Sequence, residues 1–313
     1  MSSLGLFVCA LAAVAGAVLA PACTGLIQTT KARLQGRRGP SVGQPYRELR
    51  KLWGKSTVDP DGSSIIYRTA PAVVAAALGC ALVVVGAAIV PGRVPFTSPL
   101  GTDFLLLLGL FVLARFALAV SAWDTGSGFG LMAVARDLMI AISGEAVMLL
   151  ALTLAALPAS STDLRVMADA SAGASVWTTP THWCALLVFA IVTIAELGRQ
   201  PIDNPDTHLE LTMIHEGPLL EYAGRDLAFL QWAASARHVV LISIMVGIFL
   251  PHVDTVAVQL VVAALGFAAV LVGLAFVETL LAKMRLLRVP VFLGTSALVA
   301  LIGLATWFLV PAS

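Results

Sequence analysis

The chain alternates between long apolar runs and shorter polar segments, and eight of the apolar runs are long enough to be helices that cross a membrane. They cover about residues 4–27, 69–91, 104–122, 133–157, 181–198, 238–250, 256–282 and 289–310. The sixth run is short, so we expect its helix to begin before His238. The pattern predicts an all-α integral membrane protein with about eight transmembrane helices, which form a single polytopic domain over residues 1–313.

Composition supports the same prediction. Hydrophobic residues make up 59% of the chain and charged residues 12%, whereas a soluble domain carries about 25% charged residues. Such a chain cannot cover a water-facing surface, and nothing in it predicts a nucleic-acid partner. We find no convincing internal repeat, which argues against a stand-alone ion transporter because many transporters show paired halves.

The positions of Lys and Arg predict the orientation in the lipid bilayer. If the N-terminus faces outward, the inner loops hold sixteen of the nineteen Lys and Arg residues. The positive-inside rule then gives N-out and C-out, with two long cytoplasmic loops at about residues 28–68 and 199–237. In the first loop, a basic segment precedes a predicted short helix from Pro45 to Trp53. This helix is expected to lie at the headgroup level or under a partner subunit.

The cysteines give no sign of a metal site. They lie far apart in apolar segments, at Cys9, Cys23, Cys80 and Cys184. No pair has the spacing of zinc or iron–sulfur ligands, and His215-Glu216 is not part of an HExxH motif. We therefore expect no metal and no cofactor in this chain.

Titratable residues are densest between residues 196 and 225. They are Glu196, Asp203, Asp206, His208, Glu210, His215, Glu216 and Glu221. Asn204-Pro205-Asp206 is typical of a helix start and Gly217-Pro218 of a helix stop, which predicts short helices from about Pro205 to Glu216 and from about Pro218 to Trp232. The first helix is polar on two faces, so we expect protein to enclose it. Crowded carboxylates beside histidines can store or relay protons.

Charged residues also lie inside or at the ends of the apolar runs. They are Arg115, Asp137, Glu145, Glu196 and Glu278. Each costs roughly 2.5–3.5 kcal/mol at a helix centre, so they should face the bundle interior and find partners. Glu145 is the deepest acid of its helix, and Arg136 is about 13 Å away along the helix axis, too far for direct contact. Glu196 can pair with Arg199, three residues later.

The same motifs resemble a known family. The segment ELGRQPIDNPDTHLELTMIHEGPLLEYAGR, with TKARLQGRRGPSVGQPYRELRKL upstream, resembles the membrane subunit 1 family of respiratory complex I. It is closer to the branch of formate hydrogenlyase subunit 4 and the group 4 nickel–iron hydrogenases. The respiratory branch typically reads ETxRxPFDLPEAEAEL, and this chain has Asp206 and His208 where that branch has Glu. The retained positions are Glu196, Arg199, Pro201, Asp203, Pro205 and Glu210.

The resemblance implies a multi-pass subunit of a bacterial or archaeal cytoplasmic (inner) membrane that anchors a soluble redox arm. The implied partners are a hydrogenase small subunit with iron–sulfur clusters, a large subunit with a nickel–iron centre, and antiporter-like membrane subunits. Two alternatives stay open: a quinone-site membrane subunit of a complex I-like dehydrogenase, and a stand-alone ion transporter.

These arguments select the candidate residues. The residues expected to couple protons or to line a cavity are Glu145, Glu196, Asp203, Asp206, His208, Glu210, His215, Glu216, Glu221 and Glu278. The residues expected to dock partners or to stabilise the fold are Arg33, Arg37, Arg38, Arg136, Arg199 and Arg225. No catalytic residue is expected.

Overall fold

Helices account for all the regular structure in the residues that the computed structural model describes, which are 3–89, 101–171, 173–203, 214–251 and 255–309. The α-helices are α1 (Ser3–Leu34), α2 (Gln44–Trp53), α3 (Ile65–Ile89), α4 (Phe104–Thr125), α5 (Gly128–Ala156), α6 (Leu164–Ala170), α7 (Ala174–Thr178), α8 (Pro180–Glu196), α9 (Gly224–Phe249), α10 (Val256–Leu280) and α11 (Val289–Leu309). Two short 3-10 turns, η1 (Gly217–Leu219) and η2 (Leu286–Arg288), precede α9 and α11.

Each of the eight predicted spans coincides with one of these helices. Seven helices in the described ranges are long and apolar enough to cross a membrane, namely α1, α3, α4, α5, α9, α10 and α11, the last together with η2. Helix α8 is also apolar but has only 17 residues. The protein is therefore an all-α integral membrane protein, as predicted, while the number of crossings and the N-out, C-out orientation stay predictions.

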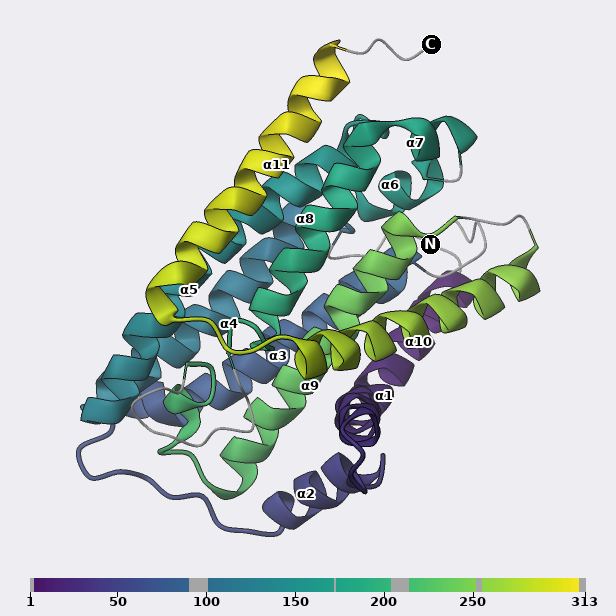
Figure 1. The fold of residues 1–313 in the computed structure, drawn as a ribbon. Coiled ribbons are helices and arrows are strands. Elements are labelled where there is room, and N and C mark those ends of the chain that lie inside the picture. Colours follow the sequence, from purple (N-terminus) through teal and green to yellow (C-terminus); the bar gives the residue numbers. More distant parts are fainter. Residues whose placement is uncertain (1–2, 90–100, 172, 204–213, 252–254, 310–313) are drawn as a thin grey trace.

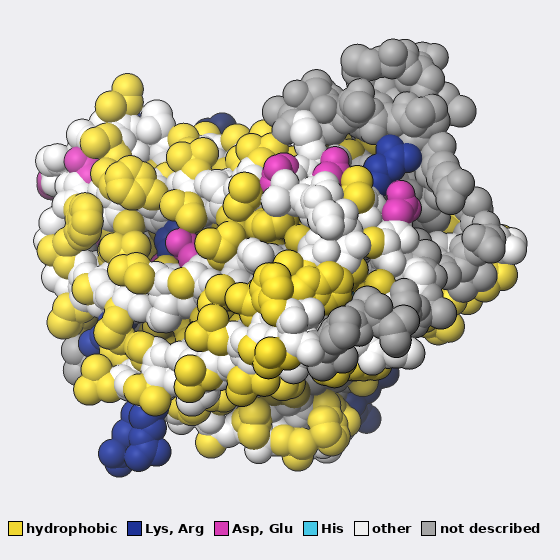
Figure 2. All heavy atoms as spheres, turned by 90° about the horizontal axis from the view of Figure 1, so that it is seen from above, with side chains coloured by type: hydrophobic (Ala, Val, Ile, Leu, Met, Phe, Trp, Pro, Cys, Tyr) yellow, Lys and Arg dark blue, Asp and Glu magenta, His cyan; other side chains and the backbone are white. Residues whose placement is uncertain are grey.

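The long helices pack in two groups (Figure 1). Helices α1, α3, α4 and α9 form one group, and α5, α8 and α11 form the other. Contacts of α4 with α5 and of α8 with α9 join the groups. Helix α10 crosses the bundle obliquely beside α1, and α2 lies at the end of the bundle opposite α6 and α7 (Figure 1). Seen from the α6 and α7 end, most side chains are hydrophobic or uncharged (Figure 2).

A proline inside α1 opens a backbone contact to α9. Pro21 has no N–H, so the carbonyl of Ala17, four residues earlier, lacks its usual helical donor. The indole N–H of Trp232 in α9 donates to this carbonyl at 3.1 Å. The sequence thus places a helix-breaking residue where another helix supplies the missing hydrogen bond.

A second proline ties α3 to the loop that precedes α9. Pro71 leaves the carbonyl of Tyr67 without a helical donor, and the Tyr222 hydroxyl donates to it at 3.0 Å. In return, the Tyr67 hydroxyl donates to the carbonyl of Glu221 at 2.7 Å. The two tyrosine rings stack with centroids 4.3 Å apart. This reciprocal pair fixes the loop that carries several of the candidate residues.

The second inner loop is shorter than the sequence predicts. Helix α9 begins at Gly224, which confirms that the sixth span begins before His238. The predicted separate helix from Pro218 to Trp232 is wrong, because a 3-10 turn and an extended Ala223 precede α9. The predicted helix from Pro205 to Glu216 falls mainly on residues 204–213, which lie outside the described residues, and residues 214–216 are not helical.

The predicted helix in the first inner loop is present as α2. Its Trp53 ring meets Phe229 of α9 edge to face, with centroids 5.2 Å apart. The Tyr46 hydroxyl donates to the carbonyl of Val18 in α1. Arg47 and Arg50 of α2 are exposed, while Tyr46 and Trp53 make its contacts with α1 and α9.

Candidate functional site

Arg115 lies at the centre of a buried ion cluster between α4, α5 and α8. Its side chain is 6% exposed, and its guanidinium contacts three carboxylates. Nη1 is 2.8 Å from Glu145 Oε1, Nη2 is 2.9 Å from Glu196 Oε2, and Nε is 3.5 Å from Asp137 Oδ2. The charged side chains inside the apolar helices therefore pair with one another, which offsets the cost of burying them.

Arg237 adds a second guanidinium to this cluster. Its Nη1 is 3.5 Å from Glu196 Oε2, and its guanidinium carbon lies 5.4 Å from the centre of the Phe111 ring. The ring face attracts the cation and covers it with an apolar surface. Two arginines thus face three carboxylates, so the cluster carries a formal charge of −1 when all three acids are ionised.

His215 connects the ion cluster to the inner loop. Its Nδ1 is 3.3 Å from Asp203 Oδ2, and its backbone N–H donates to the same oxygen at 3.2 Å. On the other side of the ring, Nε2 is 3.6 Å from Asp137 Oδ1. Lys283 donates to Asp203 Oδ1 at 2.8 Å. The imidazole therefore stands between two carboxylates that belong to different parts of the chain.

Asp203 is held in its ionised form. Burial alone would raise the pKa of its carboxyl group, but the hydrogen bonds and charges of His215 and Lys283 hold that pKa well below its usual range. The ionised carboxylate gives the His215 ring and backbone N–H a fixed acceptor.

A second buried cluster joins α1, α9, α10 and the turn after α8. Glu278 accepts a hydrogen bond from Arg199 Nη1 at 3.0 Å and lies 3.3 Å from Lys31 Nζ. Arg199 also contacts His238 Nε2, at 3.2 Å from Nε and 3.0 Å from Nη2. His238 Nδ1 lies 2.8 Å from the carbonyl of Ala234. One arginine thus ties the turn after α8 to the transmembrane helices around it.

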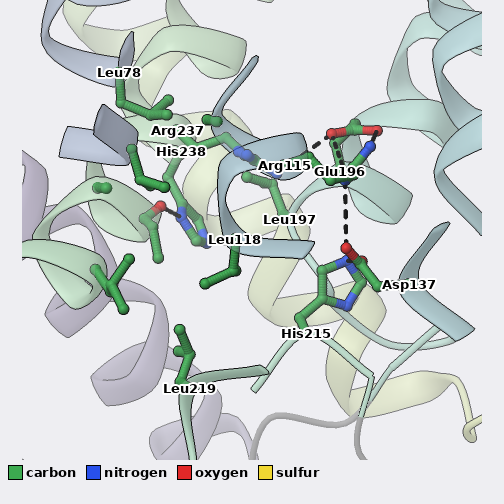
Figure 3. Close-up of a pocket in the computed structure, with 15 residues that line it drawn as sticks. Leu78, Arg115, Leu118, Asp137, Glu196, Leu197, His215, Leu219, Arg237 and His238 are labelled. Carbon is green, nitrogen blue, oxygen red and sulfur yellow. Dashed lines mark hydrogen bonds and ion pairs between the residues drawn. The ribbon is translucent and has the colours of Figure 1, made fainter. Parts of the chain in front are cut away.

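A cavity of about 120 Å³ lies beside the Arg115 cluster and reaches His238 of the second cluster (Figure 3). Its polar lining is Arg115, Asp137, Glu196, His215, Arg237 and His238. The rest of its wall is apolar and includes Leu78, Leu118 and Leu219. A cavity of this size with polar groups in its wall is large enough for water molecules, whereas drug-sized ligands occupy pockets of about 300–1,000 Å³.

The structure brings together six of the predicted residues. They are Glu145, Glu196, Asp203, His215, Glu278 and Arg199. Asp206, His208 and Glu210 lie outside the described residues. Four of the predicted arginines are exposed at the end of α1, in the loop after it and at the start of α9, namely Arg33, Arg37, Arg38 and Arg225. Glu216, Glu221 and Arg136 are partly exposed and belong to neither cluster.

One expected ion pair is wrong. Glu196 does not pair with Arg199; it pairs with Arg115 and Arg237, and Arg199 pairs with Glu278. Helix α8 ends in a reversing turn, in which the Gly198 N–H bonds to the carbonyl of Ala195 and the Arg199 N–H to that of Ile194. This turn directs Arg199 away from the helix face that carries Glu196.

Several members of the two clusters were not among the candidate site residues. They are Arg115, Asp137, Arg237, His238, Lys31 and Lys283. Position inside an apolar run marks Arg115 and Asp137 as residues that need partners. The sequence does not indicate that Arg237 needs a partner, because the apolar run of its helix begins only at residue 238.

The described residues contain no group of three or more His, Cys, Asp or Glu side chains that could hold a metal ion. The four cysteines are separate free thiols. The clusters described above combine carboxylates with arginines and lysines, which balance much of the buried negative charge.

Comparison with known proteins covers nearly the whole chain. Residues 6–309 match the sequence pattern of a family described as NADH dehydrogenase. Formate hydrogenlyase subunit 4 of Escherichia coli is 33% identical over 286 residues, which are 86% of this chain and 87% of that protein. Hydrogenase-4 component C of the same organism is 34% identical over 235 residues, 75% of this chain and 72% of that protein.

Two further comparisons extend the similarity. An NADH-quinone oxidoreductase subunit of Geobacter sulfurreducens is 33% identical over 203 residues, 61% of this chain and 60% of that protein. Among solved structures, a chain of the membrane-bound sulfane sulfur reductase, an archaeal respiratory membrane complex, superimposes with a TM-score of 0.81. This superposition covers 96% of the present chain and 98% of the other at 20% identity, so it shows a shared fold.

Proposed function

The chain belongs to the NADH dehydrogenase subunit 1 family, and from this premise we propose that it is the membrane-anchoring and proton-coupling subunit of a group 4 nickel–iron hydrogenase or formate hydrogenlyase-type complex. At the coarser level, it is a membrane subunit of a complex I-like complex in a prokaryotic cell membrane. The two hydrogenase relatives match 86% and 75% of the chain and the quinone oxidoreductase relative 61%, which favours the hydrogenase branch.

The observation that carries the proposal is a chain of ionisable side chains that leads from the inner loop into the membrane-spanning helices. It runs from Lys283 and Asp203 through His215 and Asp137 to Arg115 and ends at Glu145. The contacts along it are 2.8 to 3.6 Å long. Buried charges of this kind are costly in a membrane, so their retention supports a role in moving charge.

The proposed role divides between the residues. His215 takes up a proton on one ring nitrogen while the other releases one toward Asp137. Arg115 holds the three acids in place and lowers the cost of their charge. Glu145, whose side chain is 25% exposed, is the end of the chain. It receives the proton from Asp137 through water, because the Arg115 guanidinium keeps its own protons, and passes it to an antiporter-like subunit.

Anchoring is assigned to the inner loops. Four exposed arginines lie at the end of α1, in the loop after it and at the start of α9, namely Arg33, Arg37, Arg38 and Arg225. They would dock the hydrogenase small subunit, which would carry the iron–sulfur clusters, beside the large subunit with the nickel–iron centre. The redox chemistry then takes place in those partners, and this chain moves only protons.

Replacing Glu145 by Gln tests the proposal. The purified complex, reconstituted in liposomes, is expected to keep its hydrogen evolution from reduced methyl viologen and to lose most of its proton translocation. Glu48→Gln on the exposed side of α2, where Glu48 bonds to Gln44 at 3.0 Å, is the matched control. Full proton translocation in Glu145→Gln would contradict the proton-coupling role.

Purification from native membranes separates the alternatives. Hydrogenase subunits that co-purify with the chain support the proposal. A complex that reduces an added short-chain quinone and evolves no hydrogen replaces it with the quinone-site subunit. A solitary, monodisperse chain replaces it with the stand-alone ion transporter.

A further inference from the structure

Gly198 contacts a functional side chain rather than merely ending a helix. It follows the C-terminal residues of α8 with φ of +60°, the left-handed conformation that favours glycine at a helix end. A Cβ atom at this position would lie 2.8 Å from Cγ and Nδ1 and 3.2 Å from Cδ2 of the His215 ring. Real Cβ atoms do not approach other atoms so closely. The imidazole therefore rests against bare backbone, in space that any other residue would fill.

The position of this ring decides whether the chain of ionisable groups is continuous. His215 Nε2 and Asp137 Oδ1 face each other at 3.6 Å, which is just beyond a hydrogen bond. Both atoms are buried and make no hydrogen bond within the described residues. Both residues line the cavity of about 120 Å³, which is large enough for a water molecule to bridge these two polar atoms.

We propose that Gly198 is a positioning residue for proton transfer. Because it has no side chain, the His215 ring can stand between Asp203 and Asp137 and pass a proton across the junction, directly or through one water of the cavity. A Cβ at residue 198 would push the ring away from this junction and interrupt the chain at its narrowest point. The inference rests on the proposed proton-coupling function.

The chain offers a matched control for the backbone conformation. Gly126, at the end of α4, has φ of +65°, and a Cβ there would meet no atom within 4 Å. Gly126→Ala thus imposes the same left-handed penalty without a clash. Gly198→Asn is the complementary variant, since Asn tolerates this conformation but carries a Cβ. If Gly198→Ala fails to assemble, Gly198→Asn carries the test.

The measurement is the number of protons translocated per hydrogen evolved by the reconstituted complex, with reduced methyl viologen as electron donor. A general loss of folding lowers the amount of complex but leaves this ratio unchanged. We expect Gly126→Ala to keep the ratio, and Gly198→Ala and Gly198→Asn to lower it about tenfold or more, because ångström-scale misplacement of a reacting group costs on the order of 100-fold.

A double-mutant cycle identifies the residue through which Gly198 acts. His215→Ala removes the ring, so Gly198→Ala should cause no further fall in the ratio in that background. A ratio for Gly198→Ala equal to that of Gly126→Ala overturns the inference, and so does an additive loss in the double variant. If His215→Ala and Glu145→Gln both keep the full ratio, the proposed function itself is wrong.

Discussion

Replacing Arg115 by Gln removes the guanidinium that contacts Glu145, Glu196 and Asp137 within 3.5 Å. Breaking a buried ion pair by removing one partner costs about 3–5 kcal/mol. Arg237 still lies 3.5 Å from Glu196, so we expect the lower end of this range, about 3 kcal/mol. With about 2–4 °C per kcal/mol for domains somewhat smaller than this chain, the melting temperature should fall by roughly 6–12 °C.

Thermal unfolding of the purified complex in detergent measures this change. A thiol-reactive dye reports on unfolding because Cys9 and Cys23 are buried in the fold. Arg68→Gln is the control, since the 3.1 Å pair between Arg68 and Asp59 is exposed and should contribute less than about 1 kcal/mol. If Arg115→Gln melts at the same temperature as Arg68→Gln, the cluster does not contribute as argued.

A second variant checks that charge is the cause. Adding Glu196→Gln to Arg115→Gln removes one acid as well as one cation, which restores the formal charge of the cluster. We expect the double variant to melt above Arg115→Gln alone, because fewer uncompensated charges stay buried. A double variant that is less stable by the sum of the two single losses would refute the electrostatic explanation and point to packing instead.

Two further predictions concern the inner loop. Tyr222→Phe removes the hydrogen bond to the Tyr67 carbonyl and should lower the free energy of unfolding by about 1 kcal/mol, measured by thermal unfolding. Burial raises the pKa of Tyr222 to about 12, so the stability that this hydroxyl contributes is complete below pH about 10 and is lost as the pH rises through about 12. The Phe variant should lack this alkaline loss. Asp203→Asn should change stability at acidic pH, because His215 and Lys283 hold the pKa of Asp203 below its usual value. The stability that the ionised carboxylate contributes is present above pH about 3.9 and is lost as the pH falls further. The melting temperature of the Asn variant should therefore depend less on pH in this acidic range.

The positions of the long helices could be predicted because apolar runs are the dominant signal in a membrane chain. The residue at which α9 begins could not be predicted in this way. Arg225, Asp226 and Arg237 make the first half of this helix look like a polar loop, although Arg237 lies against Glu196 and the Phe111 ring. Hydropathy counts each charged residue as if it were alone, and pairing between helices removes much of that cost.

The partners within the clusters were harder to predict than their members. Sequence spacing reveals neighbours on one helix, which is why a Glu196–Arg199 pair was expected. The observed pairs join residues far apart in the chain, 81 positions for Arg115 with Glu196 and 79 for Arg199 with Glu278. Such pairs depend on how the helices pack, and the left-handed turn at Gly198 sends Arg199 toward α10.

Charge balance links the two clusters, which both contribute residues to the wall of the cavity. Among the described residues, the cluster around Arg115 carries a formal charge of −1, while Lys31 and Arg199 facing Glu278 give +1 with His238 neutral. The cavity touches Arg237 of the first cluster and His238 of the second. A proton that neutralises the first cluster removes its attraction to the second, which is about 4 kcal/mol for unit charges 4 Å apart near a protein surface and less at longer range. The two clusters are therefore coupled by charge across the cavity, while the direct contacts that hold Arg199 are those with Glu278 and His238.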